Sequence, residues 1–123
     1  SFRHFHDDCA LLKGTNLKYI RIPANGFHPE EEDIVKFLKI IEDPDNWPVF
    51  VHCYKGDDRA GYSIAAYRMV NEGWNPDDAI AEMFNFNYNP IWFSIPGFLR
   101  RLDLEEIKEK VWTEPKPRFN NCE

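Results

Sequence analysis

The sequence is poor in cysteine and has no long apolar run. Its three cysteines, Cys9, Cys53 and Cys122, are too few and too scattered for a disulfide framework, and no Cys/His spacing resembles a zinc site, so we expect no bound metal. A reducing compartment is the simpler prediction. No apolar stretch has the roughly 20 residues of a membrane span, and the first residues lack the apolar core of a signal peptide. We expect a cytoplasmic location, or a periplasmic or secreted one if an upstream signal has been removed.

The sequence also lacks an excess of basic residues. Its formal net charge is −6 and its isoelectric point is about 5.2, whereas a nucleic-acid binder usually has a basic face. We therefore expect no nucleic-acid partner. An anionic substrate would have to be attracted by a local positive patch.

What the chain does contain predicts one globular domain over residues 1–123. Apolar residues make up 43% and aromatic residues 15%, which is too many for a disordered chain, and the length suffices for one core. The sequence predicts strands over 17–22 and 49–51, of which the second is buried. It also predicts four helices: one begins at Pro29, one covers 62–70, one begins at Pro76 and one covers 98–112. This alternation predicts an α/β fold with a small, mostly parallel central sheet flanked by helices. Because two strands are too few for a stable sheet, residues 3–12 or an upstream segment must add to it.

The most informative stretch is 49–61, VFVHCYKGDDRAG, in which Arg59 stands six residues after Cys53. A strand, a tight loop containing Gly56 and a following helix form the arrangement in which backbone amides and a helix dipole bind an anion. The same positive potential favours the thiolate form of a cysteine, which is the nucleophilic form. The spacing therefore predicts a phosphate site with its own nucleophile. The alternative is that Cys53 is simply a buried cysteine.

The loop from His52 to Gly61 resembles the Cys-x5-Arg signature loop of the cysteine-dependent protein tyrosine phosphatase superfamily, in its small dual-specificity-like branch. The resemblance extends to residues 19–23, 37–38, 48–51, 67–68, 73–74 and 81–83. Some bacterial members of the branch act on inositol phosphates. It implies a compact phosphatase domain. It also implies two-step hydrolysis of a phosphate monoester through a phosphocysteine, with no metal or other cofactor.

The resemblance assigns roles to individual residues of the loop. Cys53 attacks phosphorus as a thiolate, Arg59 holds two oxygens with its planar fork, and His52 orients the loop and supports the nucleophile. The backbone amides of the loop bind the remaining phosphoryl charge. The implied phosphate-binding residues are Tyr54, Lys55, Gly56, Asp57, Asp58 and Arg59.

One departure from the family pattern concerns the second chemical step. The residue after the arginine is usually a serine or threonine whose hydroxyl stabilises the departing thiolate, and here it is Ala60. Loss of such a hydrogen bond slows that step by roughly 10 to 100 fold. Ser63, one helical turn further on, is a possible substitute.

The other departure concerns the general acid. Many relatives carry an aspartate on an upstream loop, but residues 23–28 contain no carboxylate. A carboxyl group beside a dianionic phosphate is protonated more easily, so an acid inside the loop is plausible. Asp58 is the favoured acid, because its position resembles that in myotubularin-like lipid phosphatases. Asp57 and His28 are the alternatives.

The expected substrate is a phosphorylated small molecule or a phosphoprotein. Inositol (poly)phosphates are favoured by the resemblance and by the position of the acid inside the loop, and cations such as Lys55 would serve their additional phosphates. Phosphotyrosine is the alternative, and for it aromatic residues after Phe84 could form the pocket wall. A hypothesis of a different class is a phosphate-binding pseudophosphatase that traps phosphorylated partners, which Ala60 suggests and the retention of Cys53 and Arg59 opposes. The sequence does not indicate an oligomeric state.

Overall fold

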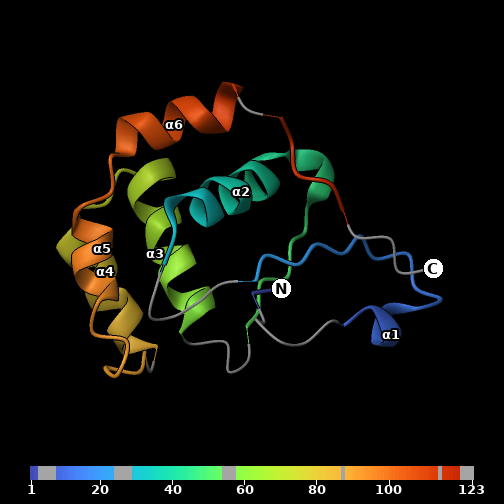
Figure 1. Cartoon of the computed structure of the whole chain (residues 1–123), viewed down its shortest axis with the longest axis horizontal. Coiled ribbons are helices and arrows are strands. Elements are labelled where there is room, and N and C mark those ends of the chain that lie inside the picture. Colours follow the sequence, from blue (N-terminus) through green and yellow to red (C-terminus); the bar gives the residue numbers. More distant parts are fainter. Residues whose placement is uncertain (3–7, 24–28, 54–57, 87, 114, 120–123) are drawn as a thin grey trace.

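The architecture is seen in a computed structural model that describes residues 1–2, 8–23, 29–53, 58–86, 88–113 and 115–119. Helices account for most of the regular structure in these ranges (Figure 1). In chain order they are α1 (Cys9–Leu12), α2 (Glu31–Glu42), the 3-10 helix η1 (Pro44–Asn46), α3 (Arg59–Asn71), α4 (Pro76–Asn85), α5 (Ile95–Arg100) and α6 (Leu104–Thr113).

The predicted central parallel sheet is wrong for the described part of the chain, where no strand forms. Residues 17–22 and 49–51 are extended. The first segment and the residue after the second make backbone hydrogen bonds to the short stretch Ser1 and Phe2. Ser1 makes two backbone hydrogen bonds to the first segment and Phe2 makes one to the residue after the second, each 2.8 Å long. Two residues cannot give either segment the run of hydrogen bonds that defines a ladder. Both segments therefore remain extended without forming a sheet.

Two further expectations about this region are also wrong. The strand expected from residues 3–12 is absent where the structure describes them, because Cys9–Leu12 form the helical turn α1. The segment 49–51 is not buried, since Val49 is 37% exposed and Phe50 is 84% exposed. Its apolar side chains lack the second layer that would cover a sheet face.

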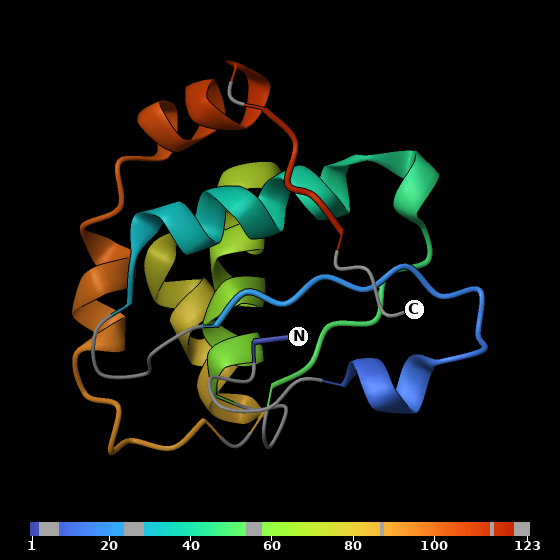
Figure 2. The same cartoon turned by 45° about the vertical axis from the view of Figure 1, so that its right-hand side comes forward.

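The helices assemble the core. In α2 the apolar residues recur at helical spacing, so one face of the helix is buried, with Ile34 and Leu38 at its centre. The small residues Ala65 and Ala66 of α3 allow neighbouring helices to approach closely. Both cartoons show α6 lying over α2, and α4 and α5 beside α3 (Figures 1 and 2). Ile107 of α6 is fully buried by this packing.

Local capping explains where the helices begin and end. The expected start of α4 is confirmed, because the Asn75 side chain accepts a hydrogen bond from the Asp77 amide at 2.8 Å. Gly73, with φ +71°, follows α3 in the left-handed conformation that suits glycine. The expected single helix over 98–112 is wrong. It is interrupted before Leu104, because the carboxylate of Asp103 accepts the Glu106 amide at 3.1 Å and starts α6 as a new helix.

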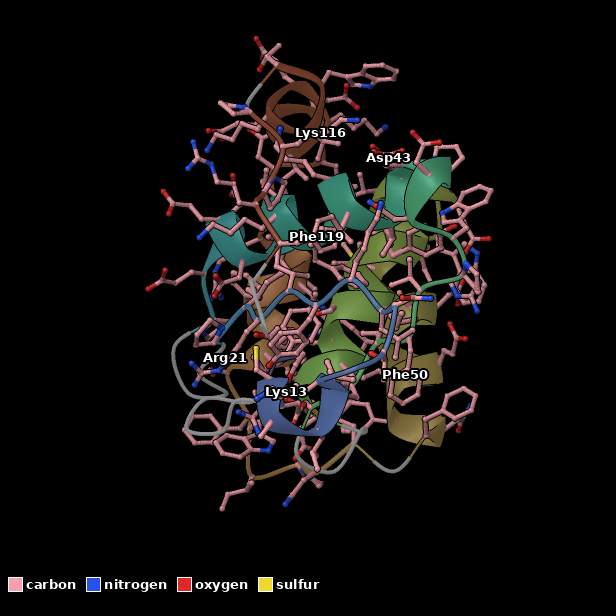
Figure 3. The ribbon with its side chains drawn as sticks, turned by 90° about the vertical axis from the view of Figure 1, so that its right-hand side faces the viewer. Lys13, Arg21, Asp43, Phe50, Lys116 and Phe119 are labelled. Carbon is pink, nitrogen blue, oxygen red and sulfur yellow. The ribbon has the colours of Figure 1, made fainter. Side chains whose placement is uncertain are left out.

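The C-terminal tail, residues 115–119, returns across the extended segments (Figure 3). Lys116 Nζ lies 2.8 Å from Asp43 Oδ2, and Lys18 Nζ lies 5.5 Å from the centre of the Phe119 ring. Cys9 is disulfide-bonded, so the expectation of reduced cysteines is wrong for this residue, while Cys122 lies outside the described residues. No helix in the described ranges is long and apolar enough to cross a membrane.

Candidate active site

The candidate nucleophile lies where the second extended segment ends. Cys53 is 6% exposed and is not in a disulfide. It directly follows His52, whose backbone carbonyl accepts the Phe2 amide at 2.8 Å. The thiol therefore sits at the edge of the core, on a backbone that a hydrogen bond holds from the side.

The other end of the loop is the start of α3. Arg59 is the first residue of this 13-residue helix, so the positive end of the helix dipole points back toward the loop, as anion binding requires. Four predicted phosphate-binding residues, together with the alternative acid His28, lie outside the described residues: Tyr54, Lys55, Gly56 and Asp57. The structure thus describes both ends of the predicted loop.

The pKa of the buried Tyr62 hydroxyl is influenced by charges on several residues, Arg59 and Cys53 among them. Burial raises the pKa of Tyr62, and the nearby Asp33 carboxylate raises it further. The Arg59 guanidinium acts in the opposite direction, while Cys53 adds to the increase. The predicted nucleophile and the predicted phosphate-binding cation therefore both influence the pKa of this hydroxyl, in opposite directions.

Asp58 connects the loop to the segment after α4. It occupies the N-cap position of α3, but its carboxylate does not cap the helix. Instead, Oδ1 accepts a hydrogen bond from the Asn89 amide at 3.0 Å. The neighbouring Tyr88 is buried, and burial together with the charge of Asp58 raises the pKa of Tyr88. The predicted acid is thus held by a contact that the sequence analysis missed.

Ser63 is engaged within α3. Its hydroxyl is fully buried and donates to the Arg59 carbonyl at 2.9 Å. Ala60, the position at which the family pattern has a hydroxyl, is also buried, at 5% exposure. The proton of Ser63 is therefore used inside the helix in this structure.

His52 is fixed from two sides. Its ring stacks on Phe50 with 5.4 Å between centroids and 26° between planes, and its Nε2 lies 3.3 Å from Oδ2 of Asp8. Asp8 could not be predicted as a neighbour of His52, because nothing in the local pattern around Asp8 connects it to the signature. In the described ranges, no three His, Cys, Asp or Glu side chains gather as metal ligands.

Comparison with known proteins identifies the class. A family model described as "DSP-PTPase phosphatase fused to NAD+ Kinase" matches residues 5–90, and the chain belongs to this family of dual-specificity-like cysteine phosphatases. The predicted superfamily is thereby confirmed.

Individual relatives share only part of their length with this chain. The dual specificity protein phosphatase TpbA of Pseudomonas aeruginosa is 28% identical over 78 residues, which cover 63% of this chain and 36% of TpbA. The human RNA/RNP complex-1-interacting phosphatase is 40% identical over 74 residues, or 54% of this chain and 22% of that protein. The mRNA-capping enzyme of Caenorhabditis elegans is 30% identical over 105 residues, or 80% of this chain and 16% of the enzyme.

The fold likeness covers more of the chain. The crystal structure of P. aeruginosa TpbA matches with a TM-score of 0.74, over 90% of this chain and 71% of that one. Because the sequence identity in this comparison is 22%, it shows a shared fold only.

Proposed function

We propose that the chain hydrolyses phosphate monoesters through a phosphocysteine at Cys53. The observation that carries the proposal is the pairing of a buried thiol at one end of the loop with Arg59 at the start of α3 at the other. Family membership supports it. The two groups supply the two requirements of the reaction, which are a nucleophile and a preformed site for the oxygens of the transferring phosphoryl group.

In the first step, the Sγ of Cys53 forms a bond to phosphorus while the bond from phosphorus to the leaving oxygen breaks. Arg59 and the loop amides hold the phosphoryl oxygens. We assign the proton that the leaving oxygen needs to Asp58. Since Asn89 occupies Oδ1 of Asp58, the proton belongs on Oδ2.

In the second step, water attacks phosphorus, the S–P bond breaks, and the proton of the water passes to Asp58. Inorganic phosphate leaves and the thiolate is restored. Ala60 offers no hydroxyl to the departing thiolate, and Ser63 donates to Arg59 instead. Hydrolysis of the phosphocysteine is therefore the slow step in this proposal.

For the substrate we propose inositol (poly)phosphates, with phosphotyrosine proteins as the second class. The formal charge of −6 makes a local cationic patch necessary for any polyanion. The aromatic residues that could favour phosphotyrosine differ in their exposure to solvent. Tyr88 is buried in the core, whereas Phe86 and Phe93 are 67% and 81% exposed.

The test is phosphate release from inositol hexakisphosphate, a phosphotyrosine peptide and a phosphoserine peptide, with Cys53→Ser as the inactive comparison. The serine variant should lose at least about 1,000-fold in rate, because an alcohol is a far poorer nucleophile than a thiolate. Release by wild type from the inositol substrate alone supports the favoured class. Equal release by wild type and Cys53→Ser contradicts the mechanism.

A second candidate, a phosphate-binding pseudophosphatase, is favoured by one observation, the unavailability of a hydroxyl near Ala60. It predicts that the wild type binds phosphate or a phosphopeptide but releases none. A rapid burst of product equal to the enzyme concentration, followed by slow turnover, would instead show a working first step and a slow second one.

A further inference from the structure

We propose that Asp8 is a positioning residue of the active site, which orients the His52 ring and so fixes the backbone from which Cys53 enters the phosphate loop. This inference rests on the proposed function. Asp8 lies far from the signature loop in the sequence, and its role follows from three features of its surroundings.

The first feature is that the carboxylate of Asp8 is buried without serving its usual structural purpose. Asp8 is 7% exposed, and a buried carboxylate is costly unless polar groups compensate it. It occupies the N-cap position of α1, where an aspartate ordinarily accepts hydrogen bonds from the first amides of the helix. No such side-chain bond forms here. The carboxylate is directed elsewhere.

The second feature is one of the groups that it meets, another being the ammonium group of Ser1, whose pKa burial lowers and the Asp8 charge raises. Oδ2 of Asp8 lies 3.3 Å from Nε2 of His52, and only about a quarter of the His52 side chain is exposed. A carboxylate beside one ring nitrogen fixes the orientation of an imidazole and determines which nitrogen carries the proton. With the ring also stacked on Phe50 and the backbone carbonyl bonded to Phe2, His52 is held at three points.

The third feature is that Asp8 itself is anchored. Its amide donates to the Tyr19 hydroxyl at 3.2 Å, which ties it to the first extended segment. The next residue, Cys9, is disulfide-bonded. Because Asp8 is anchored to Tyr19 and adjoins the disulfide-bonded Cys9, its carboxylate can hold the ring of His52 in one place. His52 is the residue directly before the proposed nucleophile.

The test compares three proteins: Asp8→Ala, Asp8→Asn and the control Asp45→Ala. Asp45 lines the same groove of about 700 Å³ as Asp8 and His52, but it is exposed. For Asp8→Ala we expect kcat/KM and the rate of Cys53 alkylation by iodoacetamide to fall about 10-fold, the effect of losing one polar contact to a charged group. Asp8→Asn keeps an acceptor oxygen and should remain within about 3-fold of wild type. The control should be unchanged.

A spectroscopic measurement separates positioning from general stability. In wild-type protein with 15N-labelled histidine, Nε2 of His52 must give the signal of a protonated nitrogen, because a carboxylate can only accept. An unprotonated Nε2 overturns the proposal whatever the variants do. So does an Asp8→Ala protein whose alkylation rate and His52 signals match wild type.

Failure of the proposed function would look different. If wild type released phosphate from no substrate, the alkylation rate of Cys53 and the His52 signals would still decide the role of Asp8. If Asp8→Ala does not fold, the wild-type signal of Nε2 and the Asn variant carry the decision.

Discussion

In the half of the molecule built from α2 to α6, apolar side chains interlock in a common core, and Leu38, Leu99 and Ile107 are fully buried. In the other half, made of residues 8–23, 47–53 and 115–119, the chain is extended apart from the single turn α1, and no helices pack against one another. Leu17 is 68% exposed and Phe50 is 84% exposed. Figure 1 shows the helices α2 to α6 packed together, with the extended segments and the short helix α1 beside them.

The difference matters because the proposed reaction takes one group from each half. Arg59 is the first residue of α3, a helix whose inner face is packed in the helical core. Cys53 comes from the extended half, where a few specific contacts to His52 hold the chain. In the proposed site, the phosphate-binding arginine thus belongs to the packed helical half, while the nucleophile depends on individual polar contacts.

The largest expected effect is a loss of activity on substitution of the arginine at the start of α3, and not of the arginine in its last turn. Arg59→Lys keeps a positive charge but removes the planar fork, and kcat/KM for p-nitrophenyl phosphate should fall about 100 to 1,000 fold. Arg68→Lys is the matched control in the same helix. Arg68 binds Glu72 and Glu82 and should leave activity within about twofold, since it contributes to the fold. Similar losses in both variants would remove the distinction between the two ends.

The next effect compares core packing directly. Leu99→Ala, in α5, should lower the free energy of unfolding by about 2–5 kcal/mol, because it leaves a cavity in the helical core. Phe50→Ala should change it by no more than about 0.5 kcal/mol, because that ring is largely exposed. Urea denaturation measures both. A large loss at Phe50 would show that the extended half is packed after all.

Removing the disulfide of Cys9 shows how much this cross-link contributes to the stability of the extended half. Cys9→Ser should lower the free energy of unfolding by about 2–4 kcal/mol under oxidising conditions, through the greater freedom of the unfolded chain. Cys53→Ser, which removes no disulfide, is the comparison; its loss of stability should be the same with and without reductant, whereas the loss in Cys9→Ser should vanish when wild type is also reduced. Thiol titration of the denatured wild type without reductant should find fewer than three free thiols. Three free thiols would contradict the disulfide.

The smallest effect is a pH dependence in the helical half. Burial raises the pKa of Asp33, and the charge of Glu30 adds to the increase. The folded state therefore binds this proton more tightly than the unfolded state, so stability declines as pH rises through the window above 3.8, the ordinary value. Asp33→Asn should gain stability relative to wild type across that window and not below it. A difference that is independent of pH would contradict this assignment.

The helices were largely predictable from the sequence because their signals are local. The apolar spacing in α2 and the Asn75-Pro76 start of α4 appear within a few residues. The break between α5 and α6 was missed because the signal at Asp103 is a single cap within a continuous apolar pattern. The sheet was predicted wrongly because strand formation depends on partners elsewhere in the chain.

The same distinction between local and long-range signals applies to the candidate site. The spacing of Cys53 and Arg59 is a local pattern, so both could be chosen from the sequence. The contacts of His52 with Asp8, and of Asp58 with Asn89, join segments that are far apart in the chain. A single sequence carries no periodic or motif signal for such pairs. Only the folded chain reveals them.

The hydrogen bond from Phe2 to His52 also has a consequence for the order of folding. A contact between residues so distant in sequence forms only after a long loop closes, which costs entropy that local helix pairs such as α3 and α4 do not incur. Helical structure should therefore return early during refolding, and the proposed phosphatase activity should return later. For an interval the chain is helical while the residue before the proposed nucleophile has no fixed position, so a refolded circular-dichroism signal does not guarantee a formed site.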